Sequence, residues 1–127
     1  MSNDGSGARL RRSLVGPEYY ERAMARTDPF NQPFQEYFNT HVWDGVWSRE
    51  GLSLKARSLV VVSCMIAQNR PNELLIHVRA ALKNGWTLLE LREVILQTAA
   101  YCGAPAAVEA MRVINEHMAD EIAALAP

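Results

Sequence analysis

The residues best suited to chemistry in this chain are Glu73 and His77, which lie four positions apart. In a helix, positions i and i+4 share one face, so a carboxylate and an imidazole there could share a proton. Arg70 lies three residues before Glu73 and would add a guanidinium at the same helix start. An ordinary surface pair with this spacing contributes only about 0.3 to 0.5 kcal/mol. That reading stays open beside a second one, in which the apolar residues 74–76 favour partial burial of the pair and so a perturbed pKa of the kind that catalysis uses.

Arg57 is a second candidate, because it lies in a predicted helix over residues 54–68, just before an apolar run. A guanidinium there needs an anion, since an unpaired interior charge is costly. The anion could be an acidic side chain of the chain itself, such as Glu93, or a carboxylate of a ligand. Trp43 and Trp47 are also one helical turn apart. They fit core or interface aromatics, and either indole could donate a hydrogen bond to a ligand.

The remaining reactive side chains are less informative. Cys64 and Cys102 have no metal-binding or redox spacing and are interpreted as buried small hydrophobes. His41 and His117 look peripheral. His, Asp and Glu do not recur at metal-ligand spacing, and no Gly-rich phosphate loop occurs. A metal site and a nucleotide site therefore have no support in the sequence.

Helices are expected to position these residues, because no segment alternates between apolar and polar residues with the two-residue period of a strand. Thr87 and Glu90 form a capping-box pattern at one helix start, and Gly85 fits a left-handed helix end. The chain is predicted to be all-α, a compact bundle of about six helices. The predicted helices cover approximately residues 17–26, 33–42, 54–68, 71–84, 87–102 and 105–122.

The composition favours one ordinary domain. The chain has 127 residues, of which 49% are hydrophobic and 21% charged, enough apolar material for one core. Residues 1–8 are small and polar and are expected to form a flexible tail before a single domain over residues 9–127. The net charge of -1, without a basic stripe, argues against nucleic acid as a partner. The longest apolar run, residues 59–67, is too short to span a membrane, and residues 1–7 lack a secretory pattern, so a cytoplasmic location is the expectation.

Several ordered blocks make the chain resemble the carboxymuconolactone decarboxylase family, within the alkylhydroperoxidase-like superfamily. The resemblance runs from about Arg12 to Met118 and implies an alkylhydroperoxidase-like, all-α fold. The blocks are Thr27-Asp-Pro-Phe, Pro33-Phe-Gln-Glu, Trp43-Asp-Gly-Val-Trp-Ser-Arg-Glu-Gly-Leu, Arg57-Ser-Leu, Glu73-Leu, His77-Val-Arg-Ala-Ala-Leu-Lys-Asn-Gly, Glu93-Val and Tyr101-Cys-Gly-Ala-Pro-Ala-Ala.

The resemblance implies an enzyme, a carboxy-lyase that converts 4-carboxymuconolactone to 3-oxoadipate enol-lactone in protocatechuate breakdown, within the β-ketoadipate pathway of aromatic catabolism. No cofactor should be needed, because the ring double bond and the lactone carbonyl accept the electrons that carbon dioxide leaves behind. A lactone dicarboxylate is the expected partner, and a homo-oligomer of three or six subunits is expected. His77 is the expected proton donor, with Glu73 setting its tautomer or charge. The expected substrate-binding residues are Arg57, Arg70, Trp43 and Trp47.

The chain departs from the family pattern at Pro71 and Asn72, where the family commonly has Trp and an acidic residue, so the rim of the site and the substrate could differ. Thiol peroxidases of the same superfamily use a Cys-x-x-Cys pair, and their cysteine positions fall on Arg70 and Glu73. Peroxidase chemistry of that type is therefore disfavoured. Two alternatives stay open: an enzyme of this fold acting on another lactone or β-keto acid, and a non-catalytic oligomeric binding protein.

Overall fold

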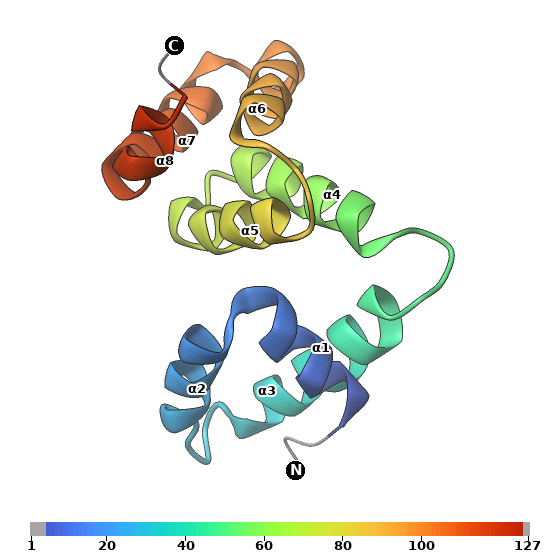
Figure 1. The fold of residues 1–127 in the computed structure, drawn as a ribbon. Helices are drawn as coiled ribbons and strands as arrows, with labels where there is room; N and C mark the ends of the chain where they lie inside the picture. The colour runs from blue at the N-terminus through green and yellow to red at the C-terminus, as the bar shows by residue number, and fades with distance from the viewer. Residues whose placement is uncertain (1–4, 126–127) are drawn as a thin grey trace. The chain divides into compact units, whose positions relative to one another are not determined.

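Every regular element in the computed structural model, which describes residues 5–125, is a helix (Figure 1). The all-α prediction is therefore confirmed. The chain divides into two compact units, unit 1 up to Leu54 and unit 2 from Lys55 onward. The helices of unit 1 are α1 (Ser6–Val15), α2 (Pro17–Ala25), α3 (Gln32–Tyr37) and η1 (Phe38–Trp47). Those of unit 2 are α4 (Leu54–Ala67, which begins at the last residue of unit 1), α5 (Pro71–Lys83), α6 (Leu88–Cys102), α7 (Ala104–His117) and α8 (Ala119–Ala123).

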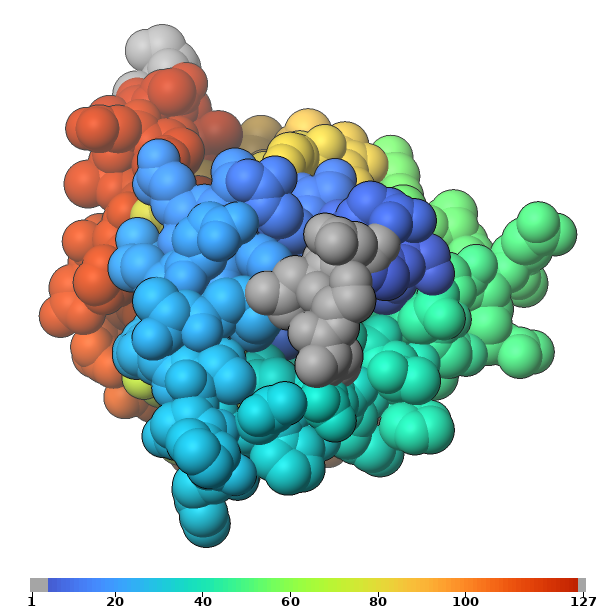
Figure 2. Space-filling view, turned by 90° about the horizontal axis from the view of Figure 1, so that it is seen from below, coloured from blue at the N-terminus to red at the C-terminus, as the bar shows by residue number. Residues whose placement is uncertain are grey.

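Unit 1 is built around a close contact between α1 and η1. A Cβ atom added to Gly7 would lie 2.1 Å from the backbone oxygen of Asn39 and 2.7 Å from the backbone nitrogen of Asp44. Only glycine therefore allows the two helices to approach this closely. The hydroxyl of Ser6 donates a hydrogen bond to the Asp44 carboxylate at the same place. Figure 2 is a space-filling view in which one face of this unit is seen in blue to cyan.

The helix η1 is a π-helix, in which the backbone hydrogen bonds reach five residues back rather than four. It directly continues α3, so the expected single helix over residues 33–42 is in fact an α-helix followed by a wider one that extends to Trp47. π-Helical geometry is rare and is found frequently at functional sites. The wider turn carries Trp43 and Trp47, both predicted site residues.

Unit 2 holds the larger core, made by α4 to α8. Two helix-end features that the sequence predicts are present in the structure. The Thr87 hydroxyl accepts a hydrogen bond from the Glu90 backbone N–H at 3.1 Å, and the Glu90 carboxylate accepts one from the Thr87 N–H at 3.0 Å. Gly85, which follows the capping residue Asn84 of α5, has a positive φ of 105°. The core consists mainly of Val62, Ile66, Leu74, Val78, Leu91, Ile95, Val113, Ile114 and Met118.

The boundaries differ from the predicted ones in two places. Helix α1 begins at Ser6, so part of the segment expected to be a tail is helical, while residues 1–4 lie outside the described residues. The expected last helix over residues 105–122 is divided into α7 and α8 at Met118, which has φ -129° and ψ 37°. The described residues thus contain eight α-helices and one π-helix, compared with the six expected. Among residues 5–125, no helix has the length and apolar character that crossing a membrane requires.

Candidate functional site

The first turn of α5 carries the predicted catalytic pair. Arg70 is the capping residue, and its carbonyl oxygen accepts a hydrogen bond from the Leu74 N–H at 2.8 Å. Pro71 occupies the first helical position, where its missing N–H costs nothing. Glu73 is exposed in this turn, whereas His77, one turn later, is half-buried. The sequence prediction that Arg70, Glu73 and His77 belong to one helix start therefore agrees with the structure.

His77 has a strongly perturbed pKa. Burial lowers the pKa of its imidazole from 6.5 to about 4, because the charged form loses hydration. The negative charge of Glu73 acts in the opposite direction and raises this pKa, but it does not offset burial. The imidazole is therefore neutral at pH 7 in the chain without substrate. A perturbed histidine next to a carboxylate is a recognised mark of a functional site.

Arg57 is the fourth residue of α4 and is half-buried. The sequence left open whether Glu93 pairs with it. In the structure the Glu93 carboxylate lies 3.8 Å from a guanidinium nitrogen of Arg92, its neighbour in the chain, and is exposed. Glu93 thus belongs to a weak surface pair on α6.

Two side-chain hydrogen bonds tie the start of α4 to the end of α5. The Asn84 amide donates to the Ser58 hydroxyl at 2.7 Å, and the Trp86 indole N–H donates to the Lys55 carbonyl at 2.7 Å. The Lys55 ammonium also lies 4.5 Å from the centroid of the Trp86 ring, a cation–π contact. These contacts hold the helix segment that carries Arg57 against the end of the helix that carries His77.

The predicted tryptophan pair lies in unit 1, on η1. The rings of Trp43 and Trp47 are stacked, with centroids 4.8 Å apart and planes at 14°, and both residues are buried. The Trp43 indole nitrogen is fully buried and has no hydrogen-bond partner among residues 5–125. A buried N–H without an acceptor costs about 1–3 kcal/mol, and such a group is a ready donor for a ligand oxygen.

The sequence prediction missed Arg11 of α1. This arginine is only 6% exposed, and its guanidinium donates to two side-chain amide oxygens of unit 1. A signal for it exists in the sequence: Arg11 follows Gly7 by four residues and precedes Leu14 by three, so it lies on the small and apolar face of the helix. An arginine on such a face indicates a buried charge.

The cysteine interpretation was wrong. Cys64 and Cys102 are both free and exposed in the chain, because they lie on the outer faces of α4 and α6 rather than among the core residues.

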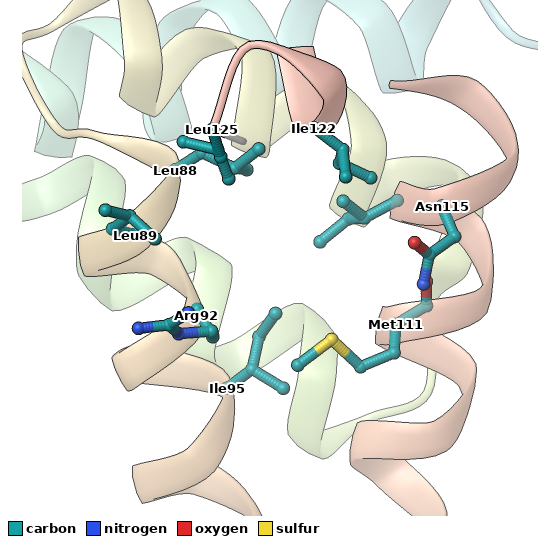
Figure 3. Close-up of a pocket in the computed structure, with 9 residues that line it drawn as sticks. Leu88, Leu89, Arg92, Ile95, Met111, Asn115, Ile122 and Leu125 are labelled. Atoms are coloured by element: carbon teal, nitrogen blue, oxygen red, sulfur yellow. The ribbon is translucent and has the colours of Figure 1, made fainter. Parts of the chain in front are cut away.

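An open cavity of about 220 Å³ lies between α6, α7 and α8, with mainly apolar walls that include Leu88, Ile95 and Ile122 (Figure 3). Among the described residues, none of those predicted to bind substrate lines it. The cavity is therefore a separate feature of unit 2.

Comparison with known proteins gives an independent view of the chain. The sequence model described as the carboxymuconolactone decarboxylase family matches residues 32–116. The chain is 40% identical over 116 residues to the nitrosuccinic acid decarboxylase npaB of Metarhizium robertsii, and the aligned region covers 91% of this chain and 81% of that protein. It is 39% identical over 116 residues to the 4-carboxymuconolactone decarboxylase of Acinetobacter baylyi, and the aligned region covers 91% of this chain and 83% of that protein.

Proposed function

Because the chain belongs to the carboxymuconolactone decarboxylase family, and is therefore a carboxy-lyase, we propose that it converts 4-carboxymuconolactone to 3-oxoadipate enol-lactone in protocatechuate breakdown. The observation that carries the proposal is the half-buried His77, whose pKa is about 4 and which lies one turn after Glu73. The 39% identity to a 4-carboxymuconolactone decarboxylase supports the choice of substrate. The family and the enzyme class rest on the comparisons. The substrate and the residue roles are our proposal.

The reaction needs no external electron acceptor. The bond between the ring carbon and its carboxylate breaks, carbon dioxide leaves, and the electron pair moves through the ring double bond to the lactone carbonyl. The resulting dienolate carries its negative charge mainly on oxygen until a proton is added to carbon. The protein must therefore bind two carboxylates, stabilise an oxyanion and supply one proton.

The proposed binding groups are two arginines and two indoles. Arg57 and Arg70 suit the carboxylates, because a guanidinium fork matches the two oxygens of a carboxylate. Trp43 and Trp47 are proposed to contact the substrate as well.

His77 is proposed to deliver the proton. Its imidazole is neutral at pH 7 before substrate binds. A substrate with two carboxylates brings negative charge close to it, which raises the pKa and lets the imidazole take up a proton together with the substrate. The charge of Glu73 acts in the same direction. After carbon dioxide leaves, the imidazolium gives its proton to the dienolate carbon and returns to the neutral form that burial favours.

The test is a direct assay of the full chain with 4-carboxymuconolactone, following ultraviolet absorbance and carbon dioxide release. We expect turnover by the wild type and a loss of roughly 100-fold or more in His77→Ala, the range for a general acid. His41→Ala, an exposed histidine of unit 1, is the matched control and should retain activity. Near-native turnover by a folded His77→Ala variant would remove His77 from the mechanism, and binding of the lactone without release of carbon dioxide would show that the lactone is not the substrate.

A second substrate deserves the same assay, because the nitrosuccinic acid decarboxylase of Metarhizium robertsii is as similar to this chain as the lactone enzyme is. Nitrosuccinic acid also has two carboxylates, and a nitro group, like a lactone carbonyl, can accept the electron pair left by carbon dioxide. If the purified chain releases carbon dioxide from nitrosuccinate and does not consume the lactone, nitrosuccinate is the substrate and the lactone is not.

We also propose that the enzyme is a homo-oligomer of three or six subunits. Large apolar side chains of unit 2 support this, since Leu96, Tyr101 and Val108 are each more than half exposed in the single chain, at 52%, 77% and 66%. Exposed apolar area of this kind commonly marks a protein interface. Light scattering of the purified chain measures the subunit number, and a monomer at micromolar concentration would contradict the proposal.

A further inference from the structure

We infer that Arg11, Tyr20 and Asn39 of unit 1 form a binding site for a carboxylate, separate from the pair on α5. The three residues come from α1, α2 and η1, and they are 6%, 2% and 4% exposed. This inference does not rest on the decarboxylation reaction, because it concerns binding alone.

The guanidinium of Arg11 is buried without an anion. It donates to Gln35 Oε1 at 2.8 Å and to Asn39 Oδ1 at 3.0 Å, both neutral amide oxygens. It also lies over two aromatic rings, 4.8 Å from the centroid of Phe38 and 5.6 Å from that of Tyr20. Among residues 5–125, no carboxylate forms an ion pair with it. The described residues therefore leave its charge without a counter-charge.

The groups around the guanidinium are donors that lack acceptors. Asn39 uses its oxygen to accept from Arg11, so its Nδ2 amide group remains, and that nitrogen is buried with no partner among the described residues. The buried hydroxyl of Tyr20 likewise has no partner there. Buried polar atoms in folded proteins are almost always hydrogen-bonded, so two such atoms beside a buried charge are exceptional.

The chemistry of this cluster selects an acceptor with one negative charge. A guanidinium, an amide N–H and a phenol O–H can all donate, and the amide oxygens nearby are already occupied by Arg11. A carboxylate has two oxygens that accept several hydrogen bonds and brings the single charge that balances one arginine. Burial also lowers the pKa of Arg11, while Tyr20 and Tyr19 raise it, in agreement with a guanidinium that has lost hydration.

The test is a titration of the full-length chain with sodium succinate, followed by NMR of the Arg11 side-chain N–H signals. The Arg11→Met variant identifies these signals, because they alone disappear from its spectrum. We expect a saturable shift with succinate and none with sodium chloride at equal ionic strength. Because the signals belong to Arg11 itself, succinate bound at another arginine leaves them unchanged.

The discriminating variant is Tyr20→Phe, which removes one buried hydroxyl and nothing else. A hydroxyl that donates to a bound carboxylate is worth roughly tenfold or more in affinity, so the dissociation constant for succinate should rise by about that factor. Tyr37→Phe, which removes an exposed hydroxyl of the same unit, is the matched control and should bind as the wild type does.

Three results would overturn the inference: no saturable shift, an equal shift with chloride, or an unchanged dissociation constant in Tyr20→Phe. The first result together with a more stable Tyr20→Phe variant would identify the cluster as a purely structural one. The titration involves no turnover, so a chain that binds succinate at Arg11 but releases no carbon dioxide from either substrate keeps this inference and loses the proposed function.

Discussion

Gly7 and Asn39 are in backbone contact, and a single methyl group at Gly7 would stand 2.1 Å from the Asn39 carbonyl oxygen. This contact brings α1 against η1 and so holds Arg11 beside the Asn39 side chain, at 3.0 Å. A glycine in the first turn of a helix is thus the element of sequence on which the geometry of unit 1 depends.

We expect Gly7→Ala to destabilise unit 1 by about 1–3 kcal/mol or more, because the backbone atoms that the new methyl group meets cannot move aside as a side chain can. Urea unfolding measures the change. Gly5→Ala is the control, since nothing lies within 4 Å of its added Cβ, and it should change stability by less than about 0.5 kcal/mol. Equal stability of the two variants would mean that α1 and η1 are not packed as described.

The pKa of His77 makes a second prediction, on the dependence of stability on pH. The folded chain holds this imidazole at a pKa of about 4, below its ordinary value of 6.5. Between these two values the unfolded chain binds more protons than the folded chain. The stability that the neutral imidazole contributes is therefore fully present above about pH 6.5 and is lost as the pH falls toward 4. The loss is on the order of 3 kcal/mol over this range.

We expect His77→Gln to flatten the pH dependence of the free energy of unfolding in this window, measured by urea unfolding at pH 4, 5, 6 and 7. His41→Gln, which alters an exposed histidine, should leave the slope of the wild type intact. If the His77→Gln variant keeps the full slope, other groups cause it and the lowered pKa of His77 is incorrect.

The capping box of α6 gives a third prediction. The Thr87 hydroxyl accepts from the Glu90 N–H at 3.1 Å, so Thr87→Ala should destabilise unit 2 by about 1 kcal/mol, the usual effect of losing an N-cap. Thr87→Ser keeps the hydroxyl and should restore most of the stability in thermal unfolding. Equal losses in the two variants would show that the methyl group, and not the hydrogen bond, matters at this position.

This capping box also shows which part of the fold can be predicted from sequence. Thr87, Glu90 and Gly85 act through atoms within a few residues, so their effect depends little on the rest of the chain, and the structure confirms them. The π-helix was missed because residues spaced for an α-helix also fit the wider turn. The break at Met118 was missed for a similar reason: Met118 is a buried core residue, and no Pro or Gly marks the end of α7.

The candidate site, like the fold, could be predicted from the sequence only in part. The positions of Arg70, Glu73 and His77 on one helix start followed from spacing alone. The pKa of His77 did not, because burial by the surrounding helices sets it. Arg11 was missed because its importance comes from partners on other helices, Gln35 and Asn39, which are 24 and 28 residues away in sequence. The substrate roles of these residues remain predictions.

The fourth prediction separates the role of Glu73 from that of His77. The negative charge of Glu73 raises the pKa of His77 against the effect of burial, so Glu73→Gln should lower that pKa further below about 4, as measured by NMR titration of the imidazole. If His77 must take up a proton with the substrate, this variant should lose roughly 10- to 100-fold in turnover, and the loss should shrink at lower pH, where protonation is easier.

Glu121→Gln, an exposed carboxylate on α8, is the control for the lost charge and should match the wild type. A Glu73→Gln variant with a lowered His77 pKa but full activity at neutral pH would show that the imidazole works in its neutral form, as a hydrogen-bond donor to the oxyanion, and that another group delivers the proton.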